Sequence, residues 1–152
     1  MRVAVISNKI KFHFIESCTL RDRNKLKSFL LNLFSKEGKK LASVNYIFCS
    51  DHYLLKINKK YLNHQYYTDI LTFVLSASQQ PIVADIYISV HRVKENARDL
   101  KLPNKTELLR VIFHGALHIC GYNDKTDRQT KIMRQKENEC IDKFGKFHVK
   151  QF

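Results

Sequence analysis

Two histidines, His114 and His118, stand four residues apart in a segment that reads FHGALHICGYND from position 113 to 124. On a helix, side chains at this spacing project from the same face, one turn apart. Two imidazole nitrogens placed in this way can bind one metal ion, at about 2.0–2.1 Å each for zinc. Gly121 suits the end of such a helix, and a turn there would bring the Asp124 carboxylate back toward both histidines. The pattern predicts a metal site with three protein ligands.

Three protein ligands leave one coordination position open, which is typical of a catalytic zinc site rather than a structural one. Histidine pairs at this spacing also occur on ordinary helix faces, and it is the added glycine and oxygen ligand that favour a metal site. A zinc peptidase helix reads His-Glu-x-x-His, in which the glutamate is the general base. Here that position is Gly115, which has no side chain to accept a proton. Peptide hydrolysis would therefore need a base from elsewhere in the chain.

The same segment resembles the signature of the YbeY-type endoribonucleases, which are bacterial rRNA maturation factors. Their pattern is His-Gly-x-Leu-His-Leu-x-Gly-Tyr-Asp-His, and this chain matches it at His114, Gly115, Leu117, His118, Gly121 and Tyr122. Two further segments, TDILTF at 68–73 and ADI at 84–86, resemble the family's Thr-Asp-Val-Leu-Ser-Phe and Gly-Asp-Ile. The resemblance covers nearly all of residues 1–152 and implies a single domain with a small sheet, surrounding helices and a metal cleft at one end.

Three positions depart from the family pattern, and at the first of them Asn123 replaces an aspartate. Asp124 stands where the family has its third histidine ligand, and a carboxylate oxygen is also an accepted zinc ligand. An anionic ligand lowers the net charge of the site, so the ion should be a weaker Lewis acid. Leu62 stands where the family has a functionally important arginine. Lys59 or Lys60 would have to replace that charge, although lysine lacks the planar fork with which arginine grips phosphate.

Asp69 and Asp85 lie in the two shorter motifs, near the ends of expected strands. Aspartates in such places commonly cap turns or accept backbone hydrogen bonds. The alternative is a supporting role beside the metal, in which the carboxylate orients a ligand histidine. The family motifs favour a place near the cleft and leave both roles open.

The chain is strongly basic, with 27 Lys and Arg against 14 Asp and Glu, a formal net charge of +13 and a pI of about 9.7. Such a domain is expected to bind a polyanion such as nucleic acid, although the charge could also serve only solubility. The cations gather in clusters, from which we expect RNA contacts by Arg21, Arg23, Lys56, Lys59 and Lys60. Beside the last cluster lie Tyr61, Tyr66 and Tyr67, whose rings could stack on unpaired bases if they are exposed.

Composition places the chain among globular proteins. Hydrophobic residues make up 44% of 152 residues, which suits one domain with a proper core. No apolar run approaches about 18 residues, so no membrane span is expected. The cysteines show no Cys-x-x-Cys spacing, and we interpret Cys18, Cys49, Cys120 and Cys140 as reduced, mostly buried thiols of a cytoplasmic protein.

Hydrophobic periodicity predicts an α+β fold, in which a small mixed sheet of four to five strands is covered by about five helices. Strands are expected over 2–7, 11–14, 44–49, 69–76 and 82–89, the last two as a hairpin. Helices are expected over about 26–37, 51–61, 90–100, 104–120 and 127–144, with caps at Asp51 and at Thr126. Glu107 is expected to help cap the metal helix, and residues 146–152 to form a flexible basic tail.

The ligand pattern predicts one Zn²⁺ per chain, and the family resemblance implies a zinc-dependent, single-strand-specific endoribonuclease in which His114 and His118 act through a metal-bound water. The resemblance implies ribosomal RNA and the small ribosomal subunit as partners, in rRNA maturation and ribosome quality control. Two alternatives remain open, a non-catalytic zinc-containing ribosome-assembly factor and a small metallopeptidase. Metal-dependent cleavage of RNA but not of protein separates all three. The sequence does not decide whether water or the substrate's own 2′-OH attacks the phosphorus.

Overall fold

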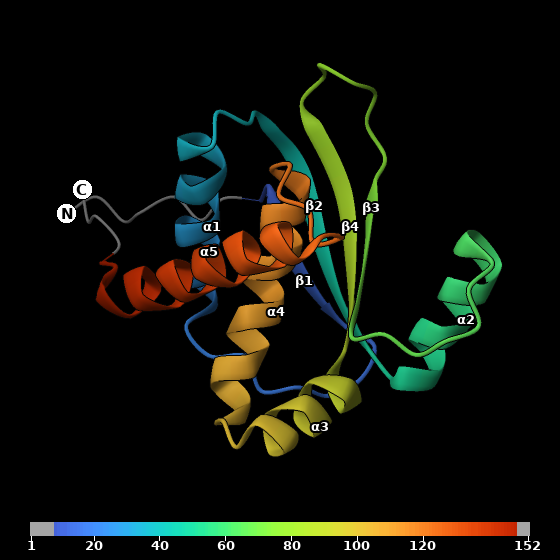
Figure 1. The fold of residues 1–152 in the computed structure, drawn as a ribbon. Coiled ribbons are helices and arrows are strands. Elements are labelled where there is room, and N and C mark those ends of the chain that lie inside the picture. Colours follow the sequence, from blue (N-terminus) through green and yellow to red (C-terminus); the bar gives the residue numbers. More distant parts are fainter. Residues whose placement is uncertain (1–7, 149–152) are drawn as a thin grey trace.

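A computed structural model describes residues 8–148, which form one mixed four-stranded sheet and five helices (Figure 1). The strands lie in the order β1-β2-β4-β3. Three of them run parallel, namely β1 (Ile10–Phe14), β2 (Leu41–Cys49) and β4 (Ile82–Ser89). The edge strand β3 (Ile70–Val74) pairs antiparallel with β4, which confirms the predicted hairpin. The strand expected over 2–7 lies outside the described residues.

The helices of the described part surround the sheet, as the periodicity predicted. They are α1 (Arg23–Lys36), α2 (Asp51–Leu62), α3 (Val90–Leu100), α4 (Asn104–Ile119) and α5 (Asp127–Lys146). The predicted capping box at Thr126 is present, since its side chain accepts from the Gln129 N–H and Gln129 reaches back to the N-cap backbone. The cap of α2 is Ser50 rather than Asp51, which is the first helical residue.

The main core lies between the sheet and the three helices α1, α4 and α5, which cover one of its faces (Figure 1). Helix α4 crosses the middle of this layer, so its side chains are buried around most of its circumference. The buried apolar residues of α4 are Leu108, Leu109, Val111, Ile112, Phe113, Ala116 and Leu117. The Tyr46 hydroxyl of β2 donates to the Ile112 carbonyl at 2.8 Å, deep in this core. The helix that carries the two histidines is therefore held on several sides.

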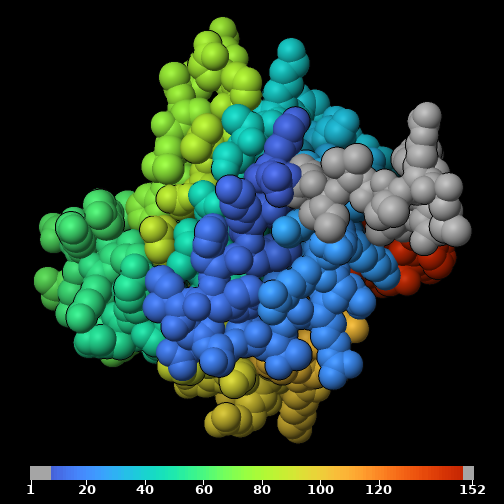
Figure 2. Space-filling model, turned by 180° about the vertical axis from the view of Figure 1, so that it is seen from behind, coloured from blue at the N-terminus to red at the C-terminus, as the bar shows by residue number. Residues whose placement is uncertain are grey.

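The opposite face of the sheet is less covered. A small second cluster forms where Leu54 of α2 packs against Cys49 and Leu71. Figure 2 shows the molecule from behind, where the edge strand β1 and the segment that follows it lie across the middle of the surface, in dark blue. Within the described residues, no helix combines the length and apolar composition that crossing a bilayer requires.

Two further local expectations differ from the structure. Glu107 does not cap α4, since Pro103 occupies the N-cap without a side-chain hydrogen bond and the Glu107 side chain turns into the protein. The predicted tail begins within the folded part, because Lys146 ends α5 and the Phe147 ring packs edge-on against Phe29, with centroids 5.4 Å apart. Residues 149–152 of that tail lie outside the described residues.

Candidate metal centre

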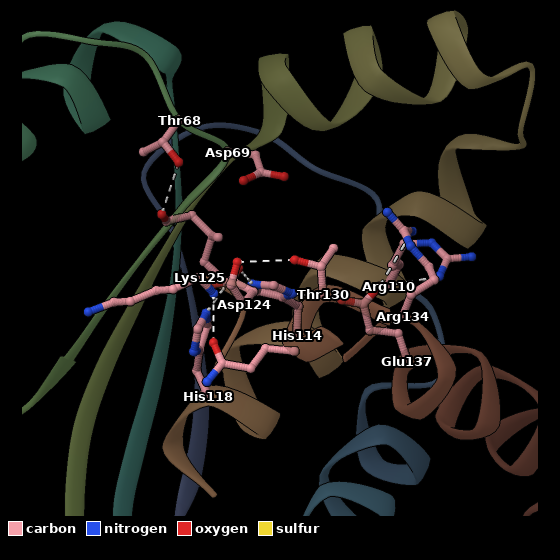
Figure 3. A network of polar contacts seen from close by, with 12 residues as sticks. Thr68, Asp69, Arg110, His114, His118, Asp124, Lys125, Thr130, Arg134 and Glu137 are labelled. Carbon is pink, nitrogen blue, oxygen red and sulfur yellow. Dashed lines mark hydrogen bonds and ion pairs between the residues drawn. The ribbon is translucent and has the colours of Figure 1, made fainter. Parts of the chain in front are cut away.

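His114, His118 and Asp124 converge at the end of α4, as the spacing predicted (Figure 3). Asp124 Oδ2 lies 3.4 Å from His114 Nε2 and 3.5 Å from His118 Nε2. Donors at zinc bonding distance in a tetrahedral arrangement are about 3.3 Å apart. The two imidazole–carboxylate separations therefore fit a divalent ion held between the three groups.

The turn after α4 brings Asp124 back toward the histidines because Gly121 adopts φ 106°, a left-handed conformation that glycine adopts readily. The Tyr122 N–H bonds to the Leu117 carbonyl at 3.0 Å, which closes the helix end. The Tyr122 hydroxyl then donates to Glu37 at the end of α1, at 3.1 Å. The other side of the turn is bound to the start of α5, where Thr130 Oγ1 donates to the Asp124 carbonyl at 3.2 Å. The turn is thus fixed from both neighbouring helices.

Glu137 of α5 orients the first histidine. Its Oε2 lies 2.7 Å from His114 Nδ1, and because an ionised carboxylate can only accept, Nδ1 carries the proton. Nε2, which lies on the Asp124 side of the ring, is then the nitrogen that would bind a metal ion. A carboxylate in this relation to a ligand histidine fixes its tautomer and ring orientation and raises its basicity. None of the sequence motifs includes Glu137, so this supporting residue was not predicted.

The buried charge of Glu137 is balanced by two arginines that lie beside it in Figure 3. Oε1 is 3.3 Å from Arg110 Nη1 and 3.4 Å from Arg134 Nη1. Arg110 also lies 3.6 Å from the buried Glu107 carboxylate. Burial raises the pKa of Glu107, which the charge of Arg110 opposes. This network joins α4 to α5 behind the ligand histidine.

Charges around the site favour a protonated His114 when no metal competes. Burial acts to lower the pKa of His114, but the hydrogen bond and charge of Glu137, with the charges of Asp124 and Asp69, outweigh it and raise the pKa. Asp69 itself lines the cleft near His114, and burial raises its pKa. Its carboxylate accepts from Asn96 Nδ2 at 3.4 Å. Among the described residues, it is Glu137 rather than Asp69 that hydrogen-bonds a ligand histidine.

Asp85 lies elsewhere. Its carboxylate accepts from Asn45 Nδ2 at 3.1 Å, and Asn45 Oδ1 is 3.0 Å from His13 Nε2, so a polar row crosses three strands of the sheet. Asp85 does not line the cleft that contains the metal site. Strand alternation turns Asp85 to the other face of the sheet, so of the two roles left open by the sequence the structure does not favour the one beside the metal.

Gly115, between the two histidines, faces the sheet rather than the metal. A Cβ at this position would lie 2.9 Å from Ile70 Cδ1 and 3.0 Å from Ile86 Cγ2. A side chain at this position would require Ile70 and Ile86 to shift. Because residue 115 is glycine, the chain has no carboxylate where a peptidase of the His-Glu-x-x-His type has its general base.

The metal site opens into a cleft of about 920 Å³ between α4, α5, β3 and the loop before β3. Of the described residues, the lysines and arginines that line it are Arg110, Lys125 and Arg134. The five cations expected from the sequence, Arg21, Arg23, Lys56, Lys59 and Lys60, do not line it. Arg23 lies over the Phe14 ring, with its guanidinium 4.4 Å from the ring centroid, and Lys60 lies 5.2 Å from the Tyr61 centroid. The expected clusters are therefore available only to RNA that extends beyond the cleft.

Comparison with known proteins identifies relatives over almost the whole chain. A family model described as Endoribonuclease YbeY matches residues 7–145. A protein named Endoribonuclease YbeY from Flavobacterium psychrophilum is 44% identical over 142 residues, which cover 93% of this chain and 99% of the relative. The protein of the same name from Flavobacterium johnsoniae is 42% identical over the same shares of both chains. A Thermotoga maritima protein solved in solution has 27% identity and a TM-score of 0.58, covering 89% of this chain and 88% of that one.

Proposed function

The chain belongs to the endoribonuclease YbeY family and is a hydrolase acting on RNA; we propose that it is a zinc-dependent enzyme that cuts single-stranded ribosomal RNA in the cytoplasm. The observation that carries this proposal is the convergence of His114, His118 and Asp124 in a cleft that also holds cations. The small ribosomal subunit, rRNA maturation and ribosome quality control are the proposed setting. The free cysteines support the cytoplasmic location.

The donor set favours zinc. Two imidazoles and one carboxylate are ligands that zinc accepts in catalytic sites, whereas magnesium and calcium prefer oxygen ligands alone. A zinc ion bound there would supply Lewis-acid polarisation of a water molecule or of a phosphate oxygen. We propose one such ion per chain.

The chain's own residues have separate tasks in the proposed reaction. Glu137 holds the His114 imidazole in the tautomer that ligates through Nε2. Arg134 and Lys125, which line the cleft, would bind the phosphates beside the cut and hold them near the metal position. Arg110 is tied to Glu137 and to Asn138, the latter at 2.8 Å, so it supports the site from behind.

RNA cleavage by the purified protein tests the proposal. We expect metal-dependent cleavage of unstructured rRNA fragments, little cleavage of duplex fragments and none of casein. A chelator should abolish the activity and added zinc should restore it. Products with a 5′-phosphate and a 3′-OH would indicate attack by water, and a 2′,3′-cyclic phosphate would indicate attack by the substrate's 2′-OH. A metal-containing protein that binds rRNA without cutting it would instead support the assembly-factor alternative.

Asp124 should be replaceable by histidine but not by alanine. Asp124→Ala removes a ligand and is expected to weaken zinc binding, whereas Asp124→His supplies an imidazole, which zinc also accepts. A neutral ligand leaves the site more positive, so the pH–rate curve of Asp124→His should shift to lower pH. Zinc affinity is measured by competition with a chromophoric chelator. Unchanged affinity in Asp124→Ala would mean that another group, such as Asp127 or His148, is the third ligand.

The cations inside and outside the cleft should differ in their effect on turnover. Arg134→Ala and Lys59→Ala should each weaken RNA binding and flatten the plot of log affinity against log salt, by about 0.7 for each phosphate that is no longer neutralised. Only Arg134→Ala should also lower kcat, because Arg134 lines the cleft and Lys59 does not. Arg98→Ala, an exposed cation of α3, is the matched control. Salt-independent binding would mean that the positive charge serves solubility alone.

A further inference from the structure

The loop between α2 and β3 carries two stacked aromatic side chains at the rim of the metal cleft. The His64 and Tyr66 rings have centroids 5.0 Å apart and planes inclined by 22°, and the Tyr66 hydroxyl lies 2.9 Å from His64 Nδ1. Both residues line the cleft, and Tyr66 is 58% exposed. Both residues are exposed, so part of the surface of each ring is accessible to a ligand in the cleft.

The backbone of this loop is fixed by one buried side chain. Asn58 of α2 is fully buried, and its Nδ2 donates to the Tyr66 carbonyl at 2.9 Å. The His64 N–H donates to the Asn58 carbonyl at 3.2 Å, just after Asn63 ends the helix in a left-handed conformation. Both ring-bearing residues are thus tied to the same point. A ligand that stacks on them would find the surface already formed, which lowers the entropy cost of binding.

The neighbouring tyrosines have other partners. Tyr67 is exposed, but the Arg92 guanidinium lies over its ring, 5.1 Å from the centroid, and Tyr67 does not line the cleft. Tyr61 packs edge-on against Phe73 with centroids 6.0 Å apart. Only Tyr66 of the three adjoins the metal cleft, so the tyrosine cluster in the sequence divides into one cleft residue and two surface residues.

The same rim carries Leu62, which lines the cleft and is 41% exposed. This is the position at which the family pattern has an arginine. An arginine could bind a phosphate, whereas leucine beside two stacked rings offers an apolar surface. Such a surface suits the face of a nucleobase, because every base has a π-face and its stacking needs no particular sequence. The phosphates would then be held by Arg134 and Lys125, elsewhere in the cleft.

We propose that His64 and Tyr66 form a stacking site for one nucleobase of the RNA strand, next to the phosphate that is bound at the metal centre. The occupant is an unpaired base, because a base within a duplex has both faces covered by its neighbours. The site selects single strands by shape and is indifferent to base identity. This inference rests on the proposed function, since it places RNA in the cleft.

Short single-stranded RNAs that carry 2-aminopurine at successive positions test the proposal, because the fluorescence of this base falls when it stacks. The chain has no tryptophan to interfere. Binding is followed by stopped flow with the full-length zinc-loaded protein, so that quenching is read before cleavage. The variants are Tyr66→Ala, His64→Ala and Tyr66→Phe, with Tyr67→Ala as the matched control. Thermal melts establish that each variant is folded.

We expect one position of the RNA to be quenched by the parent protein and this quenching to disappear in Tyr66→Ala and His64→Ala. Tyr66→Ala should weaken binding about fivefold to a hundredfold, the range for removal of one base–aromatic stack. The salt dependence of binding should not change, because every phosphate keeps its cation. Tyr66→Phe keeps the ring and should bind like the parent. An RNA with an abasic nucleotide at the quenched position should bind the parent protein more weakly than the intact RNA does. The same change should not alter binding to Tyr66→Ala.

The stacking site would be overturned if Tyr66→Ala and His64→Ala bound RNA and quenched 2-aminopurine like the parent. It would also be overturned if Tyr67→Ala lost as much RNA affinity and quenching as these two variants. Such results with cleavage intact would leave the endoribonuclease function standing. Conversely, Tyr66-dependent quenching by a protein that does not cut RNA would support the stacking site and contradict the proposed catalytic function. The two proposals therefore fail separately.

Discussion

His114→Ala and His118→Ala are each expected to lose the bound metal and to reduce RNA cleavage by about a thousandfold or more. Each variant removes one of three ligands, and the remaining two cannot hold the ion in a fixed position. The Lewis-acid contribution of a catalytic metal amounts to several kcal/mol, and each 1.4 kcal/mol or so is a factor of ten in rate. Elemental analysis measures the metal, and single-turnover cleavage of an rRNA fragment measures the rate.

The matched control is His52→Ala, which removes an exposed histidine from α2 and should change neither property. RNA affinity should remain close to that of the parent in all three variants, because the phosphates are bound by the cations and not by the ligand histidines. Full metal occupancy in both His114→Ala and His118→Ala would contradict the proposal that these histidines bind the metal. Loss of RNA binding together with metal would show instead that the cleft collapses when the ion is absent.

Glu137→Gln is expected to weaken zinc binding about tenfold to a hundredfold, the range for removal of a carboxylate that orients a ligand histidine. Glutamine has nearly the same shape, but its amide lacks the charge that favours the Nδ1–H tautomer and balances Arg110 and Arg134. The partly buried Arg110, left with less compensation for its charge, should also lower the free energy of unfolding, by about 1–3 kcal/mol.

Chelator competition measures the zinc affinity of Glu137→Gln, and chemical denaturation of the metal-free protein measures its stability. Glu139→Gln is the control on the same helix, because Glu139 forms its ion pair, among the described residues, with Lys136 at 3.7 Å and not with a residue of the site. Zinc affinity equal to the parent's, with reduced stability, would mean that Glu137 joins α4 to α5 without acting on the metal site. Reduced affinity without any decrease in stability would mean that orientation of His114 is its whole contribution.

The convergence of His114, His118 and Asp124 was predictable because it depends on local geometry. His114 and His118 are one helical turn apart, and Gly121 ends the helix where the spacing required a turn. Such relations follow from helix periodicity and backbone preferences, which short segments already contain. The same holds for the capping box at Thr126 and for the hairpin of β3 and β4, both of which are confirmed.

Glu137 was not predicted because its hydrogen bond with His114 depends on how α5 packs against α4. One signal for it was present in the sequence. Met133, Glu137, Cys140 and Phe144 recur at helical spacing, and all four are buried. A charged residue within an apolar stripe is rarely buried without a partner, so its position pointed to an ion pair or a functional role.

The cations that line the cleft could not be found from clusters in the sequence. Arg110 and Arg134 come from two helices and become neighbours only through tertiary packing. The lysines that do cluster, such as Lys59 and Lys60, lie on the last turns of α2, outside the cleft. A search for cations close together in the sequence therefore finds the charged end of α2. The cations near His114 and His118 can be found only from the three-dimensional structure.

The placement of the three proposed ligands has a consequence for how the site forms during folding. They all lie in the segment 114–124, so assembling them closes only short loops, whereas the facing wall of the cleft comes from residues 62–74. Contacts between residues near in sequence form with little cost in chain entropy, and those between distant residues wait for the sheet to assemble. The three side chains are therefore brought near one another by local structure, whereas the cleft that faces them depends on assembly of the sheet. Conditions that loosen the sheet should open the cleft before they separate His114, His118 and Asp124.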